Sequence, residues 1–177
     1  MHQPSQHSHR TLYCAAAAFL LIIVALAWPF VRRYYIQRAF IADVKDFGGM
    51  VVMEPGGPAW LRDRLPGDLA LCVDTPRVVH LENSPVDDAW LANLREHPTI
   101  EHLGLAATDI TDAGAAHVHD MPHLRVLWLS GTNITDAGLS ALDGFPELVL
   151  LYVDSTRVTE SGIAAARERL PQTDIQW

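Results

Sequence analysis

One pattern recurs four times in the C-terminal part of this chain, and each copy begins 24 residues after the one before it. Each copy has a short apolar segment followed, across a turn, by the start of a helix. The copies occupy residues 79–90, 103–114, 127–138 and 151–162, and prolines close successive units at 98, 122 and 146. A unit this short cannot bury both of its faces alone, so the copies must stack. The repeat therefore predicts an α/β fold: a short right-handed solenoid with parallel strands on its concave face and helices on its convex face.

Positions inside the repeat have structural roles that their chemistry predicts. Leu124, Leu127 and Leu129 should point inward from one strand. Thr135 should cap a helix whose next residue, an aspartate, lies at the positive end of the helix dipole, and Gly138 should permit close approach to a neighbouring coil. The same positions recur as Thr111, Thr159, Gly114 and Gly162. Hydroxyls that should satisfy backbone groups where the chain leaves each strand recur as Ser84, Thr108, Thr132 and Thr156.

These motifs carry a resemblance to a known family. The ITDAG sequences at 110–114 and 134–138, VTESG at 158–162, and the proline-leucine closures at 122–124 and 146–148 resemble the threonine-ladder leucine-rich repeats common in planctomycete bacteria. That type is similar to the cysteine-containing repeats of F-box substrate receptors, with threonine in place of cysteine. The resemblance implies a fold and a membrane anchor, but no active site. The first copy lacks the glycine, Ala115 replaces a leucine, and the last unit closes one residue late at Pro171. The chain has no F-box, so no link to ubiquitin is implied.

The N-terminus carries a second strong signal. After a polar tail at 1–11, residues 12–31 are uncharged and long enough to cross a hydrocarbon core as a helix. Arg32 and Arg33 end this segment, and Trp28 lies near its end, where an aromatic ring prefers the headgroup level. We predict a single-pass transmembrane helix at 12–31. The alternative is a signal peptide cleaved after 25–27, which would make this a secreted repeat protein.

The basic residues near the two ends of this helix predict its orientation. Arg10 precedes it, whereas Arg32, Arg33, Arg38 and Lys45 follow it. The positive-inside rule then places the repeat domain on the cytoplasmic side. The two cysteines, at 14 and 72, lie in the membrane segment and before the first repeat, and they predict no disulfide framework.

Two segments connect the membrane helix to the repeats. Residues 32–49 have apolar residues at mixed three- and four-residue spacing, which predicts an amphipathic juxtamembrane helix whose basic residues contact lipid headgroups. Residues 50–75 are predicted to form an N-terminal cap with a short strand at 50–53, a turn at 55–58 and a helical turn from Ala59. The cap is followed by the repeats at 76–177, about four units and a final strand.

The strand positions that face outward are candidates for binding. They fall into rows between repeats, so their side chains should form one surface on the concave face. The predicted protein-binding residues are His80, Glu82, His102, Val126, Trp128, Ser130, Leu150, Tyr152 and Asp154. Adjacent aromatic and aliphatic side chains with an acidic rim are typical of a binding hot spot. The alternative is that Trp128 and Tyr152 only pack on each other.

Other function classes receive no support from the sequence. A net charge of -8 and a pI near 5.5 argue against a nucleic-acid partner. His117 and His119 would face different sides of a helix, so we predict no metal site, no cofactor and no catalysis. The prediction is a non-catalytic, membrane-anchored leucine-rich-repeat module for an unknown protein partner. Its rival is a structural protein that self-associates through an uncapped end at 173–177.

Overall fold

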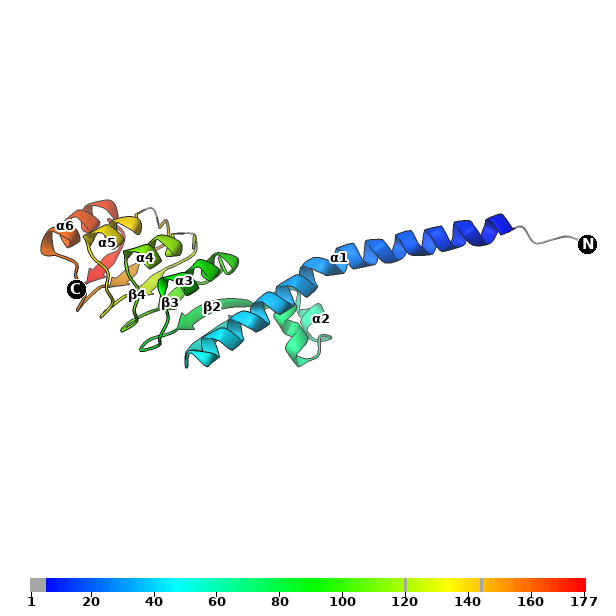
Figure 1. Ribbon diagram of the computed structural model, residues 1–177, viewed down its shortest axis with the longest axis horizontal. Coiled ribbons are helices and arrows are strands. Elements are labelled where there is room, and N and C mark those ends of the chain that lie inside the picture. The colour runs from blue at the N-terminus through cyan, green and yellow to red at the C-terminus, as the bar shows by residue number, and fades with distance from the viewer. Residues whose placement is uncertain (1–5, 120, 144) are drawn as a thin grey trace, which may run out of the picture.

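The structure is a computed structural model that describes residues 6–119, 121–143 and 145–177. A long helix leads into a sheet covered by short helices (Figure 1). The elements in chain order are α1 (Gln6–Asp46), β1 (Met50–Glu54), α2 (Ala59–Arg62), η1 (Gly67–Cys72), β2 (Thr75–His80), α3 (Asp88–Leu91), η2 (Ala92–Glu96), β3 (His102–Gly104), α4 (Asp112–Val118), β4 (Val126–Trp128), α5 (Asp136–Ala141), β5 (Leu150–Tyr152), α6 (Glu160–Arg169) and β6 (Asp174–Gln176).

The sheet has six strands in chain order, β1 to β6. Strands β2 to β6 are parallel, and β1 pairs with β2 antiparallel. The register follows the repeat, because Val79, Leu103, Leu127, Leu151 and Ile175 are successive partners. The prediction of an α/β chain with parallel strands is confirmed.

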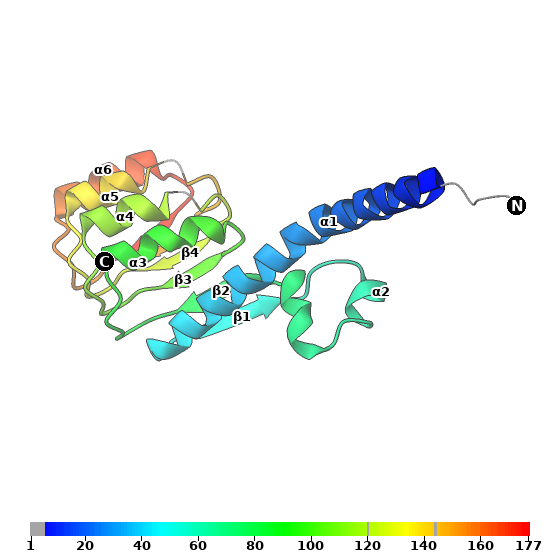
Figure 2. The same ribbon diagram turned by 45° about the vertical axis from the view of Figure 1, so that its right-hand side comes forward.

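The core lies between the sheet and helices α3 to α6, which cover one face (Figure 2). Leu124, Leu127 and Leu129 are fully buried, as predicted for inward strand positions. Ile134 and Leu139 fill the core from the helix side and are also fully buried. Because each unit shares its apolar residues with the next, the core runs continuously through the repeats.

Neighbouring repeats are joined by a bridge between an aspartate and a threonine. The carboxylate of Asp112 accepts hydrogen bonds from the backbone N–H of Thr135 at 2.8 Å and from its hydroxyl at 2.6 Å. The same bridge recurs between Asp88 and Thr111 and between Asp136 and Thr159. These aspartates were predicted to act on their own helix dipole. They also hold the following repeat in place.

The same bridge explains the repeated glycine. A Cβ atom on Gly138 would lie 2.2 Å from the Asp112 carboxylate oxygen, far inside van der Waals contact. The predicted close approach is therefore confirmed, and the neighbour is a side chain of the preceding repeat. Thr135 also acts as the predicted N-cap, since its hydroxyl accepts from Ala137 N–H at 3.2 Å. The turn hydroxyls of Ser84, Thr108, Thr132 and Thr156 each donate at 2.6 Å to the carbonyl three residues earlier.

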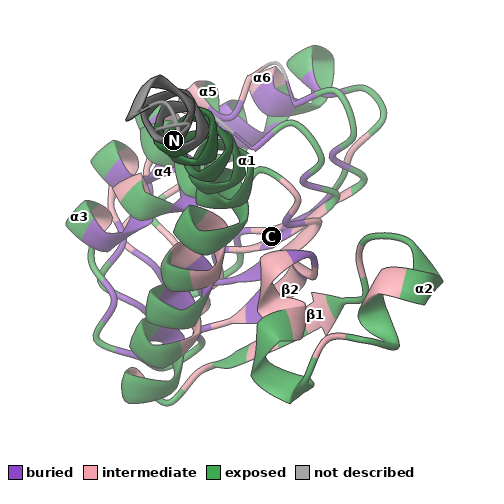
Figure 3. Ribbon diagram, turned by 90° about the vertical axis from the view of Figure 1, so that its right-hand side faces the viewer, coloured by how far each residue is buried: buried purple, intermediate pink, exposed green. Residues whose placement is uncertain are grey.

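Helix α1 is continuous across the boundary that the sequence predicts between a membrane helix and a juxtamembrane helix. It has 41 residues and includes Pro29. Among the described residues, one helix, from Ala15 to Asp46, is long and apolar enough to be a membrane span or a signal sequence, with a mean hydropathy of 2.1 in its most apolar window. Its side chains at residues 15–31 are exposed (Figure 3). Phe19 and Leu21, for example, have 66% and 69% of their surface open.

The last turns of α1 join the repeat core. Phe40 and Val44 are buried, and the Phe40 ring stacks on Trp90 of α3 at 5.8 Å. Gly48, at a φ of 79°, then ends the helix in a left-handed turn, with Gly49 N–H donating back to Val44 O at 2.8 Å. Capping was predicted for residues 50–75 alone. In the structure the end of α1 covers the first repeat together with β1.

Candidate functional site: the open face of the sheet

The face of the sheet opposite helices α3 to α6, called the open face below, carries the predicted binding residues in two rows. One row contains Val78, His102, Val126 and Leu150, and the other contains His80, Gly104, Trp128 and Tyr152. These rows are the ones that the 24-residue step predicts. Apart from Gly104, which is buried, these residues are partly exposed, whereas the alternate residues Val79 and Leu103 are buried in the core.

Aromatic rings form the centre of the open face. The Trp128 and Tyr152 rings stack with centroids 5.9 Å apart and planes 6° from parallel. The His102 ring meets Trp128 edge-on at 6.2 Å, and the His80 ring lies 5.6 Å from it. Trp128 and Tyr152 do pack on each other, yet both keep part of their surface open. A stacked pair of this kind is rigid and remains available to a further apolar group.

Gly104 allows the His80 side chain to reach Trp128. It lies between them in the row, and a Cβ there would be 2.2 Å from Glu82 Oε1 and 2.9 Å from His80 Nδ1. The space is occupied by the His80 and Glu82 side chains, whose Nδ1 and Oε1 atoms are 2.7 Å apart. Any larger residue at 104 would displace this pair from the open face.

An acidic rim borders the aromatic centre. Asp154 is exposed, and Ser130 donates a hydrogen bond of 2.6 Å to its carboxylate. This bond orients the carboxylate. Glu82 is also exposed, and Asp174 of β6 continues the row of Leu150. The open face thus has an apolar, aromatic centre and negative charge at its edge.

Two residues of the open face were missed by the sequence interpretation. Met50 pairs with His80, and Val52 with Val78, so the first strand extends both rows by one position. Their side chains are 55% and 45% exposed. The strand predicted at 50–53 could have suggested this, since residues two apart in a strand share a face. The register between β1 and β2, however, could not be predicted, because β1 lies outside the repeat and the 24-residue step does not apply to it.

The open face has no metal-binding geometry in the part of the chain that the structure describes. No group of three or more His, Cys, Asp or Glu side chains there could hold an ion. His117 and His119, which were predicted not to form a site, are exposed on and after α4. The arrangement of the open face suits contact with another molecule by packing and charge.

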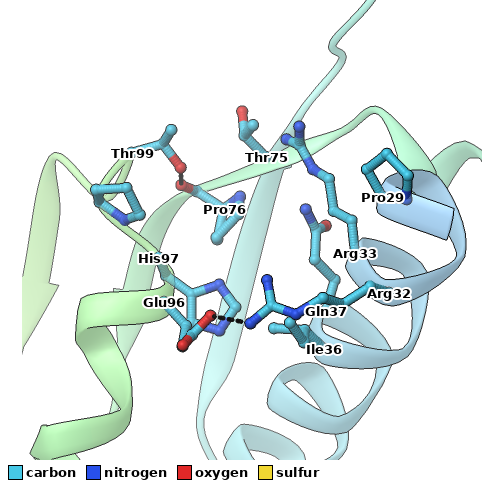
Figure 4. Close-up of a pocket in the computed structure, with 11 residues that line it drawn as sticks. Pro29, Arg32, Arg33, Ile36, Gln37, Thr75, Pro76, Glu96, His97 and Thr99 are labelled. Carbon is cyan, nitrogen blue, oxygen red and sulfur yellow. Dashed lines mark hydrogen bonds and ion pairs between the residues drawn. The ribbon is translucent and has the colours of Figure 1, made fainter. Parts of the chain in front are cut away.

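A second feature, which the sequence did not predict, is the joint between α1 and the first repeat (Figure 4). Gln37 is buried and donates to Asp74 O at 2.7 Å, and Arg33 donates to the same carbonyl at 3.2 Å. Arg32 pairs with Glu96 at 3.1 Å. A cavity of about 320 Å³ lies among these residues. The joint fixes the angle between α1 and the repeats.

His97 lies at the same joint and is buried against Phe40, with ring centroids 3.9 Å apart. Burial lowers the pKa of His97 to about 4 from an ordinary value of 6.5, with the Glu96 charge opposing this shift and the Arg33 charge adding to it. The neutral imidazole is therefore the form that packs against α1.

Comparisons with known proteins agree with this architecture. Residues 120–142 match the family model described as Leucine Rich repeat. The fold is similar to a solved structure of leiomodin-1 actin-binding site 2, with 19% identity, a TM-score of 0.47, and coverage of 56% of this chain and 68% of that chain. No curated protein matches by sequence. The family match thus identifies a leucine-rich repeat at residues 120–142.

Proposed function

We propose that this protein is a non-catalytic, membrane-anchored module that binds a protein partner. The repeats form a short right-handed solenoid, and the open face is its concave, partner-binding side. One observation carries the proposal: Trp128 and Tyr152 stack on a strand face where they keep exposed surface, and exposed Met50 and Val52 extend the same face on β1, beyond β2 and β3. Aromatic residues that are rigid and partly open are typical hot spots of protein interfaces.

The charge around this centre indicates the chemistry of the partner. Glu82 and Asp154 border the aromatic rings, and Asp174 lies beyond them. A partner with an apolar or aromatic side chain flanked by lysine or arginine would complement both features. The acidic rim would then mainly speed association and select the partner, while the rings would supply most of the affinity.

The membrane anchor is the second part of the proposal. The apolar side chains of α1 at residues 19–31 are exposed to the surroundings of the protein, which favours a lipid environment for them. By the positive-inside rule, the arginines that follow favour the cytoplasmic side for the repeats. The recurring turn hydroxyls of Thr108, Thr132 and Thr156 fit the threonine-ladder type of planctomycete bacteria that the sequence resembles.

A photo-crosslinking amino acid at Ser130 tests the binding proposal in native membranes. Ser130 lies at the rim of the open face, next to its aromatic centre, and Ser140 on α5 offers a matched control on the helix side. We expect a discrete protein adduct from position 130 and none from position 140. Equal adducts from both positions would contradict a specific binding face, and adducts only with a second copy of this chain would favour the structural alternative.

A further inference from the structure

The segment between β1 and β2 forms a small lobe, residues 55–72, called the cap lobe below. Its apolar side chains are Trp60, Leu61, Leu65, Leu69 and Leu71. The structure describes the whole segment, and none of its residues is buried. Trp60 is 61% exposed and Leu69 is 43% exposed. The cap lobe is thus rich in apolar residues but has no core of its own (Figure 3).

This exposure is costly unless something apolar covers it. Removing one such side chain from water is worth about 1.5–3 kcal/mol. The repeats gain this stabilisation, because their core leucines are buried. The cap lobe gains it only in part, because Leu61, Leu65 and Leu71 are half-buried while Trp60 and Leu69 remain exposed. An apolar phase outside the protein would account for the difference.

The joint with α1 determines where the cap lobe lies. Its base is held by Arg33, which donates to Val73 O and Asp74 O, and by the Arg62 and Asp74 ion pair at 3.8 Å. Arg33 is one of the two arginines that end the apolar part of α1. From this base the cap lobe projects in the direction in which α1 runs toward its N-terminus (Figures 1 and 2). It therefore reaches back toward the apolar part of α1.

We propose that the cap lobe is a second membrane contact, which inserts Trp60 and Leu69 into the lipid surface from which α1 emerges. This inference rests on the proposed membrane anchor. Tryptophan prefers the headgroup level of a bilayer, because its ring is apolar and its N–H needs a polar partner. Arg64 is exposed beside it and would meet lipid phosphates. With α1 and the cap lobe both in contact, the repeats have a fixed orientation on the membrane.

Depth measurements on the full chain in liposomes test this inference. Single cysteines at three exposed alanines, Ala27→Cys in α1, Ala59→Cys in the cap lobe and Ala164→Cys in α6, would carry an NBD fluorophore, with Cys14 and Cys72 replaced by serine. Phosphatidylcholine with a nitroxide high on its acyl chain serves as the quencher. We expect loss of fluorescence at 27 and 59 and no loss at 164.

The role of Trp60 is tested in the Ala59→Cys chain. Trp60→Ser should abolish the quenching at 59, while Trp177→Ser, at another exposed tryptophan, should leave it unchanged. Quenching at 27 without quenching at 59 would overturn the cap-lobe contact and leave the anchor standing. An absence of quenching at both positions would overturn the anchor and, with it, this inference.

Discussion

At the residue scale, three side-chain types specify how one repeat sits on the next. An aspartate in one helix accepts two hydrogen bonds from a threonine in the next unit, and a glycine makes room for the carboxylate. The threonine caps and the need for glycine were predictable from local chemistry. The contact between Asp112 and Thr135 was not, because it joins residues of different units and becomes visible only when the units are stacked.

Gly138 provides the test at this scale. Gly138→Ala would place a Cβ 2.2 Å from Asp112 Oδ1 and 3.1 Å from its Cα, so side-chain rotation alone cannot relieve the clash. We expect a loss of about 1–3 kcal/mol in the free energy of unfolding. Thermal unfolding of the full chain in mild detergent, followed by tryptophan fluorescence, measures it.

Gly67→Ala is the matched control. No atom of the described chain lies within 4 Å of a Cβ at that position. Its effect on the free energy of unfolding should stay within about 0.5 kcal/mol. If Gly138→Ala were equally mild, the close packing of neighbouring repeats would be wrong.

At the element scale, α1 shows where sequence reasoning stops. The apolar spacing of residues 32–49 predicted an amphipathic helix whose basic residues contact lipid headgroups. In the structure Gln37, Phe40 and Val44 of that helix are buried against the first repeat. Hydrophobic periodicity shows that a face is covered, but it cannot distinguish lipid from protein as the cover. The register of β1 was also unpredictable, because β1 lies outside the repeat and the 24-residue step does not determine its pairing.

His97 gives the α1 joint a predicted pH dependence. Its pKa is about 4 in the folded protein against an ordinary 6.5, so the unfolded chain binds more protons between these values. Stability should therefore fall as the pH drops from 6.5 toward 4, by up to about 1.4 kcal/mol per pH unit from this group.

His97→Phe removes the titrating group and keeps a ring against Phe40. Melting temperatures of the full chain in detergent, measured at several pH values from 7 to 4.5, should fall less steeply for this variant than for the native chain. Parallel curves for the two proteins would mean that His97 does not couple the joint to pH.

The strand β1 carries a prediction about binding. Met50 and Val52 extend the rows of the open face and are exposed. Replacing both with serine should lower the yield of the partner adduct from position 130 without changing the melting temperature beyond the range of a surface substitution. An unchanged yield would confine the binding surface to β2 through β5.

At the scale of the whole molecule, three parts act together. The apolar part of α1 and the cap lobe would hold the protein at a lipid surface, the joint of Arg33 and Gln37 fixes the angle, and the open face remains available. The repeat architecture and the rows of the open face were predictable, because one 24-residue step determines all the parallel registers. The rigid joint was not, since it depends on contacts between α1 and residues about 40 positions away.

The central claim is that the aromatic centre of the open face binds the partner. Its most direct test is the adduct yield from position 130 in a chain with Trp128→Ala and Tyr152→Ala, compared with a chain with Trp177→Ala, an exposed tryptophan outside both rows. The account predicts that the double substitution lowers the yield to the background level seen from position 140, while the Trp177 variant keeps the native yield. An adduct that persists undiminished without Trp128 and Tyr152 would contradict it.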